Sequence, residues 1–153
     1  MENKAFLDYL YYDVGKQQYN FFLARAYLDK EGKPKYSKWR AYLDAQSDDR
    51  FIANCNQRSI LPCEVILDLE SKERITPILA ELKQLNLYFF AYDTGSRGYH
   101  IHLFFNRDMT TQEKLAIIRH FGADEMKASE KTLIALENAT HWKSGKIKEE
   151  LMI

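Results

Sequence analysis

The residues of this chain that most clearly suggest chemistry lie between positions 94 and 106, where Thr94-Gly-Ser-Arg-Gly-Tyr-His100 leads into an apolar strand. Side chains alternate along a strand, so His100 and His102 would share one face. The backbone N–H groups of a glycine-rich turn can cradle phosphate oxygens, and Arg97 adds a planar fork of donors. This pattern predicts a site for an anion or a metal. For each histidine taken alone, a structural role in the core is the simpler alternative.

Two carboxylates, Asp68 and Glu70, form a second group of candidates. They end a strand-like run, Cys63–Glu70, in which Val65, Leu67 and Leu69 would face the opposite way. Carboxylates at positions i and i+2 repel each other unless a cation lies between them, and hard divalent cations prefer oxygen ligands. The alternative is a solvated strand end that precedes a helix capped by Ser71.

The elements that must position these residues can be read from hydrophobic periodicity. Apolar residues at the helical period predict helices over Ser71–Asn86 and Thr110–Phe121, the second one stopped by Gly122. Strands are expected at Leu87–Tyr92, Tyr99–Phe105 and Thr132–Leu136. The order strand, helix, strand, strand predicts an α+β fold with an open antiparallel or mixed sheet and helices on one side. The other side of the sheet would then be left free for chemistry.

The first 62 residues predict a short helix over 3–13 and a hairpin whose strands lie in 18–28 and 36–43. A helical turn is expected around Asp49–Asn54. Arg25, Trp39 and Arg40 place basic and aromatic groups on the hairpin, which suits a nucleic-acid strand but equally a solvated strand face.

Composition sets limits on the class of protein. With 153 residues and 46% hydrophobic residues, the chain can form one domain, residues 1–153, around a single core. Lys plus Arg and Asp plus Glu number 22 each, so any phosphate site must be local. No apolar run approaches a membrane span, and we expect an unsecreted, cytoplasmic protein with no membrane partner. Cys55 and Cys63 are too few for a disulfide framework or a structural zinc site.

Three separate stretches between residues 63 and 146 resemble the motifs of the archaeo-eukaryotic primases, which include primase-polymerases. Val65-Ile-Leu-Asp-Leu-Glu70 is similar to the first motif, a hydrophobic strand that ends in two acids. Thr94-Gly-Ser-Arg-Gly-Tyr-His100 resembles the second, and Asp124, the strand Leu133–Leu136 and His141-Trp-Lys-Ser-Gly145 resemble the third in order. Glu70 stands where replicative primases generally have Asp, and the family's zinc-binding module has no counterpart here.

The resemblance implies an RRM-like palm in residues 63–146, preceded by an N-terminal α/β part in residues 1–62. It implies a template-dependent nucleotidyltransferase that joins nucleoside triphosphates to a 3′-hydroxyl, with two Mg²⁺ or Mn²⁺ ions. The implied catalytic and metal-binding residues are Asp68, Glu70 and Asp124, with Glu125 as a stand-in for Asp124. The implied nucleotide-binding residues are Thr94, Ser96, Arg97, His100, His141 and Lys143. Implied partners are a single-stranded DNA template, a primer or initiating nucleotide, and a large primase subunit or a helicase.

Two other functions fit parts of the sequence. His100-Ile-His102 also resembles the paired histidines of replication initiators and relaxases, which nick single-stranded DNA through a tyrosine; Tyr9, Tyr11, Tyr12 or Tyr19 would have to serve. The third function is a non-catalytic nucleic-acid-binding module, in which sheet aromatics such as Phe90 and Tyr92 stack on bases.

Overall fold

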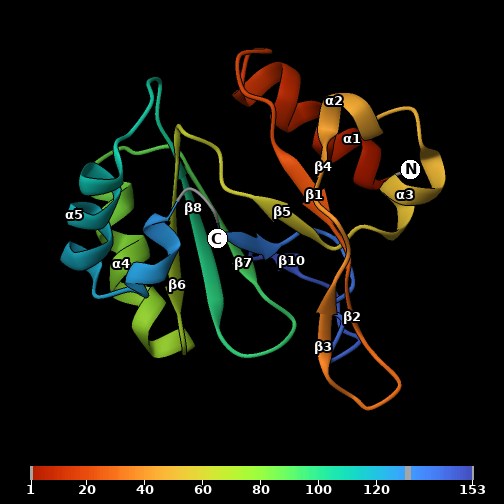
Figure 1. Ribbon diagram of the computed structural model, residues 1–153. Coiled ribbons are helices and arrows are strands. Elements are labelled where there is room, and N and C mark those ends of the chain that lie inside the picture. The colour runs from red at the N-terminus through yellow and green to blue at the C-terminus, as the bar shows by residue number, and fades with distance from the viewer. Residues whose placement is uncertain (1, 130–131, 153) are drawn as a thin grey trace.

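The computed structural model describes residues 2–129 and 132–152 and shows an α+β protein with two larger antiparallel sheets (Figure 1). One sheet has the strand order β4-β1-β5-β9 and the other has the order β10-β7-β8-β6. A third sheet is the small β2–β3 hairpin, which projects from the first. Among the described residues, no helix combines the length and the apolarity that a membrane crossing needs.

The second sheet carries the predicted motifs. Its strands are β6 (Glu64–Leu69), β7 (Phe89–Asp93), β8 (Tyr99–Phe104) and β10 (Glu149–Glu150). Two helices, α4 (Lys72–Gln84) and α5 (Thr111–Phe121), cover one side of this sheet (Figure 1). The order strand, helix, strand, strand, with helices on one side, is therefore as the sequence predicts.

Local signals explain both helices. The Ser71 hydroxyl accepts a hydrogen bond from the Arg74 N–H, which caps α4, and Thr110 with Glu113 forms a capping box at the start of α5. Gly122 ends α5 at a positive φ of 67°. Their apolar stripes bury Ile75, Ile78, Leu82 and Ile118 against Val65, Leu67, Leu69, Ile101 and Leu103. Because these residues of β6 and β8 are buried against the helices, the alternate residues, including Asp68 and His100, lie on the opposite face of the sheet.

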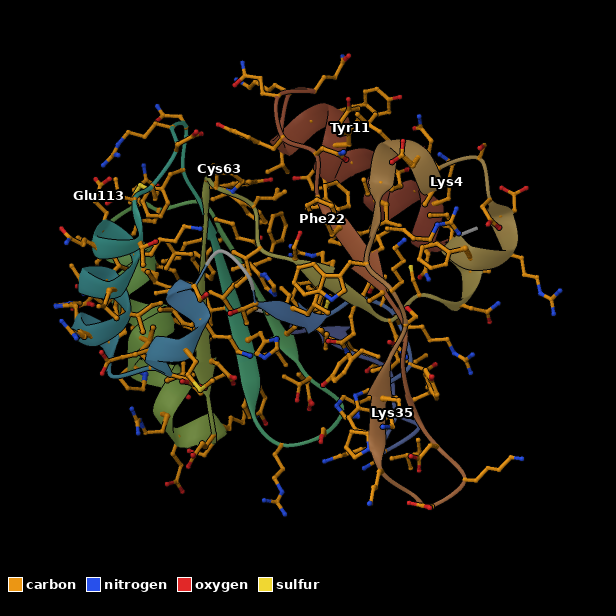
Figure 2. The ribbon with its side chains drawn as sticks, in the orientation of Figure 1. Lys4, Tyr11, Phe22, Lys35, Cys63 and Glu113 are labelled. Atoms are coloured by element: carbon orange, nitrogen blue, oxygen red, sulfur yellow. The ribbon has the colours of Figure 1, made fainter. Side chains whose placement is uncertain are left out.

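The first half of the chain builds a second core. It contains α1 (Glu2–Asp8), the π-helix η1 (Tyr9–Val14), α2 (Tyr42–Ala45) and α3 (Asp49–Asn54). Its strands are β1 (Phe22–Ala24), β2 (Ala26–Leu28), β3 (Pro34–Tyr36), β4 (Arg40–Ala41) and β5 (Gln57–Ser59), and β9 (Leu133–Ala135) joins them from the second half of the chain. The predicted helices of this part are present, and the predicted hairpin is present as two strand pairs, β1–β4 and β2–β3, although residues 42–43, predicted as strand, begin α2. Cys63 lies just before β6, where the chain enters the second sheet (Figure 2), and both cysteines are buried and free.

The expectation that the second sheet is uncovered opposite its helices is correct only at one end. Away from Asp68, toward the start of β6, Glu64, Ile66 and His102 on that side have no exposed surface. Sequence periodicity could identify this face but not the first sheet and N-terminal helices that pack near it.

Candidate functional site

Asp68 and His100 lie directly opposite each other on the neighbouring strands β6 and β8. Their side chains share the face away from the helices, and the His100 Nε2 atom is 3.6 Å from the Asp68 Oδ1 atom. On the other side of the carboxylate, the Lys127 Nζ atom is 3.9 Å from Oδ2. The Asp68 side chain is 27% exposed, so this pair lies where the covered face opens to solvent. The structure thus brings together two residues from different predicted motifs.

The His100 ring is unusual because one of its nitrogens lacks a partner. Its Nδ1 atom is buried and, among the described residues, has no hydrogen bond. A buried polar atom without a partner is costly, and such atoms occur where a ligand or water is bound. Burial and the positive charge of Lys148 together lower the pKa of His100 to about 3, against the opposing effect of Asp68. The imidazole is therefore neutral at neutral pH and has one N–H to donate.

Asp68 is ionised in this setting. Burial alone would raise the pKa of its carboxyl group, but the contact with His100 and the charges of Lys127 and Lys148 outweigh it, and the pKa lies below its ordinary value. An ionised, half-open carboxylate is a suitable first ligand for a hard divalent cation.

The turn between β7 and β8 makes close contacts with the stretches that carry the two other predicted motifs. A Cβ on Gly98 would lie 2.1 Å from the Leu69 carbonyl oxygen, and one on Gly95 would lie 2.9 Å from that of Ile147. Both glycines have positive φ, +86° and +79° respectively. The Ser144 hydroxyl also donates a hydrogen bond to the Gly95 carbonyl. Three stretches that are far apart in the sequence therefore meet at this turn.

The predicted nucleotide-binding residues of this turn differ in whether their side chains are buried or exposed. The hydroxyl of Thr94 donates to the Gly98 carbonyl at 3.1 Å and accepts from the Ser96 N–H at 3.3 Å, and Thr94 is 5% exposed. Thr94 therefore holds the turn and does not face a ligand directly. Ser96 and Arg97 are exposed at the tip of the turn, where their side chains can reach a ligand.

His141 and Lys143 lie on the turn that contacts Gly95. The His141 Nδ1 atom accepts hydrogen bonds from the backbone N–H groups of Lys143, at 3.1 Å, and Ser144, at 3.4 Å. Burial and the charge of Lys143 lower the pKa of His141. Because Nδ1 is an acceptor, the neutral ring carries its proton on Nε2 and can donate it. The Lys143 ammonium lies 5.1 Å from the centre of the Trp142 ring.

The three predicted acids line one pocket of about 380 Å³ at the end of β6, together with Arg74. Asp124 is held there because its backbone N–H donates to the Asp68 carbonyl at 3.3 Å, while its carboxylate accepts from the Met126 N–H at 3.0 Å. That second bond caps the 3₁₀ helix η2 (Glu125–Ala128). Among the described residues these three carboxylates do not form a close three-ligand cluster. Their oxygens suit Mg²⁺ or Mn²⁺, and Asp68 also lies 3.6 Å from His100, one of the predicted nucleotide-binding residues. Glu125, the stand-in, instead pairs with Arg119 at 2.7 Å.

A buried charge network next to this site was not foreseen. The Arg58 guanidinium donates to both oxygens of Glu64, at 2.8 and 2.7 Å, and to both oxygens of Glu137, at 2.9 and 2.7 Å. The Glu64 carboxylate lies 2.7 Å from Nδ1 of His102, and the Lys148 ammonium lies 3.1 Å from its Nε2. Glu64 and Glu137 have pKa values below their ordinary range because the charge of Arg58 outweighs their burial. The only hint in the sequence is a glutamate and a histidine on the face of β6 and β8 that also carries Asp68 and His100.

Glu64, His102 and Glu137 could also hold a metal ion, since their ligand atoms lie within 4.8 Å of one another. The Arg58 fork, however, already bonds both carboxylates, and the Lys148 ammonium, 3.8 Å from Glu137, supplies the second positive charge. An ion there would have to displace a buried guanidinium that makes four bonds to them, so we assign this group a structural role. Both nitrogens of His102 are engaged, which also argues against a shared metal with His100 of the kind that a nicking enzyme needs.

No known protein-family model matches the chain, and no curated protein is significantly similar to it.

Proposed function

We propose that this protein is a template-dependent nucleotidyltransferase of the primase or primase-polymerase type. The observation that carries the proposal is the meeting of three motif-like stretches near the Asp68–His100 pair, through the close approach of Gly98 to Leu69 and the hydrogen bonds from Ser144 to Gly95 and from Asp124 to Asp68. Residue types alone suggested these stretches, and nothing in a hydrophobic pattern requires them to meet. The strand order β7-β8-β6, with α4 and α5 on one side, supports an RRM-like palm beneath them.

In this proposal the cationic and neutral donors hold the triphosphate of the incoming nucleotide. Arg97 offers a fork for two phosphate oxygens, His141 donates from Nε2, and Lys143 adds a charge. The single N–H of the neutral His100 ring, on Nε2, lies toward Asp68, so its unpartnered Nδ1 atom would face the nucleotide as a hydrogen-bond acceptor. Thr94 and Ser96 shape the turn that carries Arg97.

Asp68, Glu70 and Asp124 would hold the divalent cations. Bound Mg²⁺ or Mn²⁺ would favour ionisation of the attacking 3′-hydroxyl and stabilise the charge on the departing pyrophosphate. The protein itself supplies position and charge: Asp68 stays ionised because Lys127 and Lys148 lie nearby, and the buried His100 stays neutral. No covalent intermediate with the protein is needed.

The test is incubation with a single-stranded template, labelled nucleotides and Mn²⁺, with and without a primer. We expect metal-dependent nucleotide incorporation that falls by at least about 100-fold in Asp68→Asn, because the lost charge stabilises the reacting groups directly. Asp44→Asn, an exposed carboxylate on α2, is the matched control and should retain full activity. Incorporation that survives Asp68→Asn, or that never appears with the wild-type protein, refutes the proposal. A covalent tyrosine–DNA adduct would instead identify a nicking enzyme.

A further inference from the structure

The β2–β3 hairpin concentrates positive charge in a protein whose net charge is zero. Residues 25–40 contain six Lys or Arg and two Asp or Glu, which gives this segment a net charge of +4. The basic residues Arg25, Lys30, Lys33, Lys35 and Lys38 are all exposed. The hairpin stands away from the rest of the first sheet, and Lys35 lies on β3 (Figures 1 and 2). A local charge of this size in a neutral protein suits a polyanionic partner.

One face of the hairpin combines charge with an aromatic ring. Tyr27 and Lys35 are direct cross-strand partners, so their side chains lie on the same face. The guanidinium of Arg25 lies 5.6 Å from the centre of the Tyr27 ring, which places it on that face too. Tyr27 remains 37% exposed. A cationic face with an open aromatic ring is the combination that binds a single strand, because phosphates meet cations while unstacked bases meet the ring.

This hairpin borders the proposed nucleotide site. Arg25 and Tyr27 line a groove of about 580 Å³ whose opposite wall is formed by Asn138–Trp142 and Gly145. His141 and Trp142 stack in that wall, with ring centres 5.9 Å apart. The same turn contacts Gly95 at the nucleotide site. A polynucleotide bound in the groove would therefore lie next to the turn that carries His141 and Lys143.

We infer that the groove between β2 and the 138–145 segment, with the Arg25–Tyr27–Lys35 face of the hairpin, binds a single-stranded polynucleotide. This inference rests on the proposed function, since it makes the bound strand the template. A duplex is excluded as the preferred ligand by the same reasoning, because its bases are already stacked and cannot reach Tyr27 or Trp142.

The experiment measures the fluorescence anisotropy of labelled oligo-dT and oligo-U with the full chain, in EDTA and without nucleotides, over a series of salt concentrations. We expect Tyr27→Ala to weaken binding at least about five-fold, the effect of losing one stacked base. Lys35→Glu should weaken binding and lower the slope of log affinity against log salt by about 0.7 for each phosphate that the protein no longer neutralises. The two oligonucleotides tell whether DNA or RNA is preferred.

Two matched controls keep the result interpretable. Tyr36→Ala removes an exposed aromatic ring from the opposite face of the same hairpin, and Lys83→Glu reverses an exposed charge on α4. Both should bind as the wild type does, and circular dichroism should show all four variants folded. Equal affinity of the Tyr27→Ala, Tyr36→Ala and wild-type proteins overturns the inference, as does tighter binding to a duplex of the same length.

Failure of the inference is distinct from failure of the proposed function. If the hairpin variants bind normally while Asp68→Asn abolishes synthesis, the template binds elsewhere on the protein, and the proposed nucleotidyltransferase function is retained. If the hairpin variants lose binding while no protein incorporates nucleotides, the surface is a single-strand-binding site without polymerase activity.

Discussion

Replacement of Gly98 by alanine tests whether the close approach between the β7–β8 turn and the end of β6 holds the site together. The added Cβ would lie 2.1 Å from the Leu69 carbonyl oxygen and 3.0 Å from the Glu70 Cα, both backbone atoms that no rotamer change can move. A non-glycine residue at positive φ costs roughly 1 to 2 kcal/mol, and the forced shift of a packed backbone adds about 1 to 3 kcal/mol. Alanine recovers roughly 0.4 to 1 kcal/mol through the unfolded state.

Gly32→Ala provides the matched control. Gly32 has a similar φ of +77°, but nothing lies within 4 Å of its added Cβ, so only the conformational terms apply. Gly98→Ala should therefore be less stable than Gly32→Ala by about 1 to 3 kcal/mol. In urea denaturation, with a slope of about 1.5 kcal/mol per molar, this corresponds to a difference in midpoint of about 0.7 to 2 M. Equal midpoints for the two variants would refute the close contact, and with it the geometry on which the proposed function depends.

Two further predictions concern buried charge. Arg58→Met should lower the free energy of unfolding by about 3 to 5 kcal/mol, because it removes the guanidinium that bonds both buried carboxylates, Glu64 and Glu137. Arg40→Met, which breaks the exposed pair with Asp48, should cost less than about 1 kcal/mol in the same urea titration, and similar losses for the two would contradict the network. The pKa of His100 is lowered by burial to about 3, so the unfolded state binds a proton that the folded state does not once the pH falls below about 6.5. Stability should therefore drop by about 1 to 2 kcal/mol between pH 6.5 and 5, and His100→Gln should reduce this drop, whereas an unchanged pH profile would show that His100 is not buried in its neutral form.

The parts of the fold that sequence predicts well are those specified by neighbouring residues. Ser71 caps the helix that follows it, and Thr110 and Glu113 satisfy each other's backbone groups within one turn. Alternation along β6 assigned Val65 to the helices and Asp68 to the other face, and one register of antiparallel pairing then placed Asp68 opposite His100. Each of these features depends on residues that are close in the sequence or on the two-residue alternation of side chains along a strand.

What covers the other face of the sheet depends on residues that are distant in the sequence. Arg58 and Glu137 are 79 positions apart, and nothing near either one indicates its partner. A lone arginine in β5 reads as a solvated strand residue, yet it is fully buried. For Thr94, predicted to bind a nucleotide, the sequence did not indicate that its hydroxyl would bond the Gly98 carbonyl four residues away, because only the folded turn brings the two groups together.

The Arg58 network implies that the N-terminal part is needed by the site and is not a separable attachment. The stretch that resembles the primase motifs begins at residue 63, but two of its buried carboxylates, Glu64 and Glu137, are both bonded by Arg58 of β5. Without that guanidinium, two buried carboxylates would repel each other beside His102, the neighbour of His100 on the same face of β8. The cost of an uncompensated buried charge is several kcal/mol, a large fraction of the stability of a domain this size. The sheet that carries Asp68 and His100 therefore depends on the first sheet for its charge balance, and the folding unit that carries the proposed site includes both sheets.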